Sequence, residues 1–308
     1  MKNRTLLMIP GPIEFEPAVL AAMGEPTTSH VAPVFIEAFG QALQNMRLVF
    51  DSPAGQPLVL AGSGTLAMDC AGSNLVEPGD KALVVDTGYF SERFAMLLER
   101  YGAQVTRISS SPGSRPELGR IKSALESDAY KLMTITHVDT STAVLAEVQQ
   151  IAALARPSGT LVVVDGVCSV AGEELHMDAW GIDLTLTASQ KAVGVPPGLA
   201  LLMIGPRALE AFHNRTRPVL NYYADWSNWL PIIQAYEARQ ASYFGTPAVN
   251  LIFALNISLG QILAEGMSKR YARHIAISQA CKAGLEALGL GQVPTRPEYA
   301  AHTLTAPR

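Results

Sequence analysis

The feature that most constrains the fold of this chain is a regular alternation of short apolar runs with longer helical patterns. The apolar runs have the length of strands and lie at residues 57–62, 81–88, 103–108, 130–137, 159–166, 181–188 and 198–205. Helical patterns follow several of them, at residues 64–76, 91–102 and 144–156. Such alternation is typical of a mainly parallel sheet with helices on both faces. We therefore predict an α/β fold around a seven-stranded, mainly parallel sheet.

The pattern changes after Arg207. Residues 209–247 are rich in aromatic side chains and prolines, and a long helical stretch follows over residues 248–288. Residues 302–307 are expected to open a further strand, which would have no partner before the chain ends. These changes predict three parts. They are an N-terminal arm (1–20), a large domain (21–265) and the start of a smaller α+β C-terminal domain (266–308), which we expect to be truncated.

Composition narrows the class of protein. The net charge is −4 and no basic run occurs, which argues against a nucleic-acid partner. No apolar run approaches the ~20 residues of a membrane helix, and the N-terminal one is too short for a signal peptide. Cys70, Cys168 and Cys281 lie too far apart for a disulfide framework or a zinc site. We expect a soluble intracellular protein.

In sheets of this kind ligands bind at the carboxyl ends of the strands, so the residues that follow each strand are the candidates for a site. The first strand leads through Gly62, Ser63, Gly64 and Thr65 into a helix. Backbone N–H groups at the start of a helix favour an anion, so this turn can hold a phosphate. The alternative is a plain strand-to-helix turn with Ser63 as its N-cap.

Two further strand ends carry candidate ligand contacts. Phe90 follows the second strand, where its ring can stack on a flat ligand or serve as a core or lid aromatic. The fourth strand ends in the polar segment 136–144, where Thr140 can hydrogen-bond a ligand. His137 in that segment can act as a base, although a structural histidine is the favoured interpretation.

The fifth and sixth strands end in ionisable residues. Asp165 follows four apolar residues, so its carboxylate must be paired or be buried at a cost. A cationic ring nitrogen of a cofactor is one such partner, and a helix cap is the alternative. Cys168 can be a nucleophile, but a small buried thiol is favoured. Lys191 follows the sixth strand among small residues and prolines, where a lysine in a restricted pocket can form a Schiff base.

Four features thus fall at successive strand ends of one sheet. They are an anion cradle, a stacking ring, a buried carboxylate and a pocket lysine. Pyridoxal 5′-phosphate needs this combination, because it binds a lysine through an imine, pairs its pyridinium nitrogen with a carboxylate and requires a phosphate site. The sequence therefore predicts pyridoxal 5′-phosphate as the cofactor.

The sequence resembles a known family, the class-V aminotransferases of fold type I, and within that family the alanine–glyoxylate and serine–pyruvate branch. The resemblance covers nearly the whole chain. It is carried by "LLMIPGP", "LAGSGTLAMD", "THVDTSTAVL", "VVVDGVCS", "DAWGIDLTLTASQKAVGVPPGLA" and "YFGTPAVN". The family implies a homodimer, small amino-acid and 2-oxo-acid substrates, and no membrane or nucleic-acid partner.

The resemblance also implies roles for residues at matching positions. Lys191 would hold the cofactor and shuttle the substrate's α proton, and Asp165 would pair with the pyridinium nitrogen. The remaining cofactor contacts would come from Ser63, Gly64, Thr65, Phe90, Thr140, Val167 and Gln190, with Tyr243 and Thr246 reaching the neighbouring subunit's phosphate. Pro10, Gly11 and Pro12 would line the substrate side. Relatives carry Trp at the position of Phe90 and His at that of Thr65.

The resemblance implies transfer of an amino group from L-alanine or L-serine to glyoxylate. Members of the family carry an arginine in an Arg-Ile-Gly context that clamps the substrate carboxylate, and no such motif occurs in this sequence. A truncated chain that binds the cofactor with little or no turnover is therefore one alternative. A lyase or desulfurase on the same scaffold is another. We expect a peroxisomal or cytoplasmic location.

Overall fold

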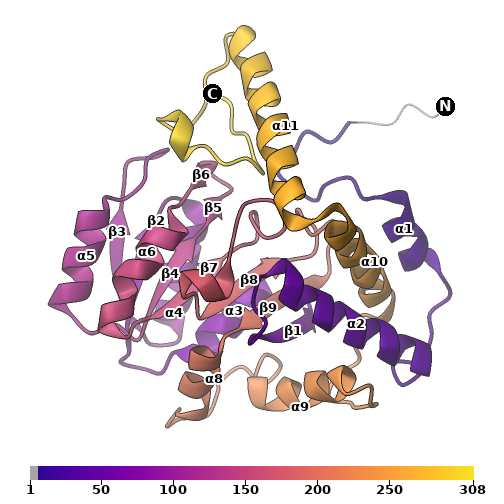
Figure 1. Ribbon diagram of the computed structural model, residues 1–308. Helices are drawn as coiled ribbons and strands as arrows, with labels where there is room; N and C mark the ends of the chain where they lie inside the picture. Colours follow the sequence, from indigo (N-terminus) through magenta and orange to yellow (C-terminus); the bar gives the residue numbers. More distant parts are fainter. Residues whose placement is uncertain (1–5) are drawn as a thin grey trace.

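The computed structural model describes residues 6–308, so residues 1–5 of the predicted arm lie outside the described part of the chain. A central sheet is built from seven strands: β1 (Gln56–Ala61), β2 (Lys81–Asp86), β3 (Gln104–Ser109), β4 (Leu132–Thr136), β7 (Leu161–Asp165), β8 (Leu184–Ala188) and β9 (Leu199–Ile204). Their order is β1-β9-β8-β7-β4-β2-β3 (Figure 1). A separate hairpin pairs β5 (Val138–Asp139) with β6 (Val144–Leu145).

The sheet is mainly parallel, as the sequence predicts. Strand β2 runs parallel to β3 and β4, β4 to β7, and β7 to β8. Only β9 runs against its neighbours β1 and β8. In this register Asp165 lies opposite Thr136 on one side and Leu186 on the other. The carboxyl ends of three central strands therefore meet at one edge of the sheet.

Helices cover both faces of this sheet (Figure 1). Helix α3 (Gly64–Leu75) packs against β8 and β9, and helix α4 (Tyr89–Arg100) packs against β2, β3 and β4. These two helices also contact each other. Helices α5 (Leu118–Ser127), α6 (Val148–Ala155) and α7 (Met177–Trp180) form a second group, in which α6 packs against β7. Every residue of β4, β7, β8 and β9 is buried, which explains the nearly continuous apolar sequences of β7 and β9.

The remaining helices are α1 (Pro17–Gly24), α2 (Pro33–Val49), α8 (Pro206–His213), α9 (Trp226–Glu237), α10 (Val249–Glu265) and α11 (Met267–Ala287). The chain also contains the 3₁₀ turns η1 (Arg156–Ser158), which contacts α6, and η2 (Pro297–Tyr299). Helix α10 packs against α1 and α2, and α2 and α9 contact β1. No single described helix is long and apolar enough to cross a membrane. Helices α10 and α11 meet that test of length and composition only jointly, across an 85° bend.

The prediction of a strand at residues 302–307 is wrong. This segment forms no named strand and makes only an isolated bridge at Pro307. The backbone N–H groups of His302 and Thr303 both donate to the buried carboxylate of Glu173. A side chain of the large domain therefore takes the hydrogen bonds that a neighbouring strand would otherwise receive.

Candidate active site

A pocket of about 220 Å³ opens at the carboxyl ends of the central strands. It collects side chains from the N-terminal segment, the starts of α3 and α4, the β5–β6 hairpin and the segments that follow β7 and β8. Most residues that the sequence predicts for the site line it: Gly11, Ser63, Gly64, Thr65, Phe90, Thr140, Asp165, Val167, Gln190 and Lys191. Met68, Arg93, Val138 and Cys168 complete the lining.

Lys191 is presented by a tightly hydrogen-bonded turn. The Gly194 N–H donates to the Lys191 carbonyl at 2.9 Å, and Gly194 has a φ of +76°, which favours glycine. The buried Ser189 hydroxyl donates to the Pro196 carbonyl at 2.8 Å and accepts the Leu199 N–H at 3.2 Å. The small residues and prolines around Lys191 therefore fix the loop that carries it.

The N-terminal segment lies directly against the Lys191 side chain. Lys191 Nζ donates to the Pro10 carbonyl oxygen at 3.0 Å, and the Ile13 N–H donates to the Gln190 carbonyl at 3.2 Å. A Cβ added to Gly11 would lie 2.7–2.9 Å from the Lys191 side chain, so only glycine permits this approach. Pro10 and Gly11 thus border the amine, whereas Pro12 does not line the pocket.

Asp165 provides a buried carboxylate in this pocket. Its exposed fraction is 3%, and its carboxylate accepts one hydrogen bond, from the Val167 N–H at 3.0 Å. Burial raises the pKa of Asp165 from 3.8 to about 7; Asp139 adds to the rise, and Arg93 and Lys191 oppose it. A cationic N–H donor in the pocket would stabilise the ionised form of this buried carboxyl, and a protonated pyridine nitrogen is such a donor.

The raised pKa of Asp165 leads to a prediction for the cofactor-free protein. The folded state favours the protonated carboxyl, so this contribution to the free energy of unfolding is complete below the unfolded pKa of 3.8 and is lost as pH rises through about 7. Relative to Asp165→Asn, the unaltered protein is expected to lose stability between about pH 4 and pH 7. Urea unfolding of both proteins across this range measures the difference, and parallel stability curves would contradict the assignment.

The start of α3 forms the candidate anion cradle. Gly64 approaches the sheet so closely that an added Cβ would lie 2.8 Å from Val167 Cγ2 and 3.4 Å from Ala188 Cβ. Ser63 makes no side-chain cap hydrogen bond to this helix, so the first N–H groups of α3 keep their capacity to bind an anion. Gln190 Oε1 is buried without a partner in the described part of the chain. This oxygen can accept a hydrogen bond from a ligand, whereas the Nε2 group of the same side chain is the part that could donate to a phosphate.

Phe90 and Thr140 are held through the β5–β6 hairpin. The fully buried carboxylate of Asp139 accepts the Phe90 N–H at 3.0 Å and the Ser91 N–H at 3.3 Å, which ties the hairpin to the start of α4. The Thr140 hydroxyl lies 2.7 Å from Cys168 Sγ. Cys168 is buried, as the favoured interpretation of its sequence context expects.

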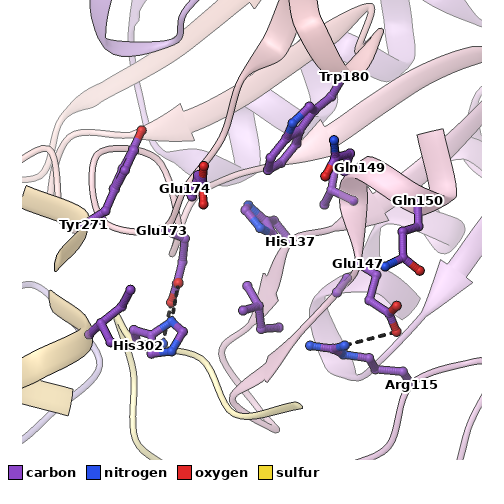
Figure 2. A pocket seen from close by; sticks show the side chains of 15 residues that line it. Arg115, His137, Glu147, Gln149, Gln150, Glu173, Glu174, Trp180, Tyr271 and His302 are labelled. Carbon is purple, nitrogen blue, oxygen red and sulfur yellow. Dashed lines mark hydrogen bonds and ion pairs between the residues drawn. The ribbon is translucent and has the colours of Figure 1, made fainter. Parts of the chain in front are cut away.

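Further residues singled out from the sequence lie outside this pocket. Tyr243, 60% exposed, and Thr246 do not line it within their own subunit. His137, for which a structural role was the favoured interpretation, faces a different cavity of about 280 Å³ that shares no lining residue with the first (Figure 2). Burial lowers the pKa of His137 to about 4, and its Nδ1 has no partner in the described residues. His137 is therefore a neutral side chain that does not line the pocket of Lys191, and its ring lies next to that of Trp180.

The lining residues that the sequence interpretation missed follow a simple rule. Met68 lies one helical turn after Thr65 on α3, and Arg93 one turn after Phe90 on α4. Residues three positions apart on a helix share a face, so Met68 and Arg93 could have been inferred from the predicted site residues Thr65 and Phe90 one turn before them. Val138 and Thr140 likewise share one face of an extended segment, with His137 on the other.

Comparison with known proteins identifies the family. The family model "Aminotransferase class-V" matches residues 19–306. The chain belongs to the class-V aminotransferases. It is 40% identical to alanine–glyoxylate aminotransferase 1 of Saccharomyces cerevisiae over 320 residues, covering 99% of this chain and 83% of the relative. It is 31% identical to L-aspartate–glyoxylate aminotransferase of Paracoccus denitrificans, covering 100% and 77%.

The fold agrees with this membership. The crystal structure of alanine–glyoxylate aminotransferase from Nostoc sp. superposes with a TM-score of 0.92 at 32% identity, over 99% of this chain and 81% of that one. Class-V aminotransferases are pyridoxal 5′-phosphate enzymes, and this chain is accordingly an aminotransferase that depends on that cofactor. The pocket fits the group: it offers a buried carboxylate without a cationic hydrogen-bond donor, a helix start without a side-chain cap, and a lysine.

Proposed function

We propose that this class-V aminotransferase transfers the amino group of L-alanine, or of L-serine, to glyoxylate. The products are glycine and pyruvate, or hydroxypyruvate when serine is the donor. The observation that carries the proposal is the 40% identity, over 99% of this chain, to a yeast protein named alanine–glyoxylate aminotransferase. A pocket with one lysine beside one buried carboxylate supports it.

In this proposal Lys191 moves the proton. When bound, pyridoxal 5′-phosphate supplies the aldehyde carbon that accepts the amino group and an electron sink for the pair left at the substrate's α carbon. Lys191 Nζ takes the α proton, holds it, and returns it on the cofactor side. The Pro10 carbonyl, 3.0 Å from Nζ, orients the amine during this transfer.

Asp165 and the helix start orient the cofactor. The Asp165 carboxylate holds a proton on the ring nitrogen, which keeps the ring electron-poor. The first N–H groups of α3, together with Gln190, bind the phosphate end. Phe90 and Val167 line the same pocket and would flank the ring. These contacts fix the ring beside Lys191 and exclude water from it.

The positions of the three cysteines argue against the alternative of a desulfurase, which needs a nucleophilic thiol on a mobile loop near the cofactor. Burial raises the pKa of Cys70 to about 12 and also raises that of Cys168, so neither thiol ionises readily. Cys281 is exposed on α11 and does not line the pocket. Aminotransfer is therefore the chemistry that these residues support.

A homodimer is part of the proposal. Tyr243 and Thr246 lie outside their own subunit's pocket. Leu220, Tyr222 and Tyr243 are large apolar or aromatic side chains that are exposed to solvent. A second copy would cover that surface and bring Tyr243 to its partner's phosphate. Light scattering is expected to give twice the 32.9 kDa mass of one chain, and a monomer that retains full activity would refute this part.

The experiment that tests the proposed reaction compares amino donors on the cofactor-loaded protein. L-Alanine, L-serine and L-aspartate are each supplied with glyoxylate, and glycine is quantified by mass spectrometry. We expect L-alanine or L-serine to exceed L-aspartate by about tenfold or more in kcat/KM, the size of a modest difference in pocket fit. Preference for L-aspartate would overturn the donor assignment. Bound cofactor without glycine from any donor would favour the non-catalytic alternative.

A further inference from the structure

Arg93 is the lining residue of the pocket to which neither the family resemblance nor the proposed mechanism gives a task. It lies on the second turn of α4, one helical turn after Phe90 and on the same helix face. Its Nη1 donates to the Thr65 hydroxyl at 3.2 Å and its Nη2 to the Tyr89 hydroxyl at 2.9 Å. The guanidinium carbon is 4.9 Å from the Tyr89 ring centroid and 5.1 Å from that of Phe90. Arg93 thus bridges the stacking ring and the start of α3.

The charge of Arg93 is not neutralised by a direct ion pair. Between residues 6 and 308, no carboxylate forms an ion pair with Arg93, and its two observed hydrogen bonds go to neutral hydroxyls. Its charge acts on Asp165 without direct contact and favours the ionised form of that carboxyl. A guanidinium has five N–H donors in a planar fork, so three of them are left for a ligand. Cation–π contact with the two rings holds the head group in place without consuming these donors.

The phosphate end of the pocket needs such a charge. A phosphate monoester carries about −1.5 to −2 charges near pH 7, whereas a helix start offers the equivalent of roughly half a positive charge. Arg93 and Lys191 are the two cations among the residues that line the pocket. Because the proposed function commits the Lys191 amine to the cofactor's aldehyde carbon, Arg93 is the cation that stays available at the Thr65 end.

We propose that Arg93 is a binding residue for the phosphate of pyridoxal 5′-phosphate and supplies the full positive charge that the start of α3 lacks. The proposal rests on the proposed function, since it places the phosphate at Gly64 and Thr65. In it, the hydrogen bond from Arg93 to Thr65 sets the guanidinium beside the cradle. The cradle is then formed by two helix starts: α3 provides N–H groups and α4 provides the charge.

The test compares the cofactor with its dephosphorylated form. Dissociation constants of pyridoxal 5′-phosphate and of pyridoxal are measured on the cofactor-free full chain by tryptophan fluorescence, for the unaltered protein and for Arg93→Gln. We expect Arg93→Gln to weaken pyridoxal 5′-phosphate binding by about 10- to 100-fold, the size of a charge-assisted hydrogen bond. Binding of pyridoxal is expected to change less than about twofold, because pyridoxal has no phosphate for the charge to hold. Arg100→Gln, at the exposed end of the same helix, is the matched control and should leave both constants unchanged.

The outcomes separate this proposal from the others. Equal loss of affinity for both ligands would assign Arg93 to the Phe90 platform instead, and unchanged affinity for both would remove it from the site; either result overturns the proposal. If Arg93→Gln does not fold, Arg93→Lys is compared with the unaltered protein: it keeps a charge but not the planar fork, so it should lose affinity several-fold for pyridoxal 5′-phosphate and less than about twofold for pyridoxal, and equal values for both ligands would overturn the proposal. The readout contains no amino donor. Failure of L-alanine as a substrate would therefore leave this result standing, and the reverse also holds.

Discussion

Lys191→Ala is expected to lower kcat for alanine–glyoxylate transamination by about 10⁴-fold, the largest effect of any single substitution in this chain. The variant removes both the amine that would hold the cofactor's aldehyde carbon and the base that would move the α proton. Cofactor affinity should fall far less, because Asp165, the α3 start and the stacking ring are untouched. Steady-state kinetics together with the dissociation constant of the cofactor separate the two effects.

Two further variants sharpen this prediction. Lys191→Arg keeps the positive charge and a donor for the Pro10 carbonyl, but a guanidinium stays protonated and cannot act as a base, so its activity should be as low as that of Lys191→Ala. Lys122→Ala removes an exposed lysine of α5 and should leave kcat unchanged. If Lys191→Ala kept more than about a tenth of the activity, the assignment of this lysine would be wrong.

Asp165→Asn is expected to lower kcat by about 10²- to 10³-fold, the size of the loss when one preorganised electrostatic partner is removed. The amide occupies the same volume but carries no charge, so it does not favour a proton on the ring nitrogen. The carboxylate is buried and raised in pKa, so its replacement should not destabilise the cofactor-free protein above pH 7. A variant that is stable but slow would separate a chemical role from a structural one.

The matched control for Asp165→Asn is Glu126→Gln, the same exchange of a carboxylate for an amide on the exposed face of α5. It should leave both kcat and stability unchanged. A value of kcat within about threefold of the unaltered enzyme for Asp165→Asn would show that the ring nitrogen needs no carboxylate. A comparable fall in stability and activity would instead assign Asp165 to the core.

The sheet could be predicted because its central strands are buried on both faces and are rich in apolar residues, most clearly in Leu161–Asp165. The location of the candidate active site could be predicted from the same arrangement of strands. Once the strands are parallel, the residues after their carboxyl ends must meet, and Asp165, Lys191 and Gly64 do line one pocket. Strand length can be read from each apolar run, and parallel direction was inferred from the helical patterns between the runs, so no knowledge of individual distant contacts was needed for this step.

Features that depend on contacts between distant segments could not be predicted. Glu173 takes the backbone donors of residues 302–303, and nothing in the local pattern of either segment indicates that pairing. The hydrogen bond between Lys191 and Pro10 joins the N-terminal arm to a residue 181 positions later in the chain. Arg93 was overlooked because an arginine near the start of a helix usually faces solvent, and only its hydrogen bond to Thr65 places it at the pocket.

Chemical trapping tests directly whether this pocket binds pyridoxal 5′-phosphate covalently through Lys191. The cofactor-loaded protein is reduced with borohydride and digested, and the modified peptide is sequenced by mass spectrometry. We expect a phosphopyridoxyl group on Lys191 in the unaltered protein and on no other lysine. Label on a different lysine, or no label in a protein that is shown to bind the cofactor, would contradict it.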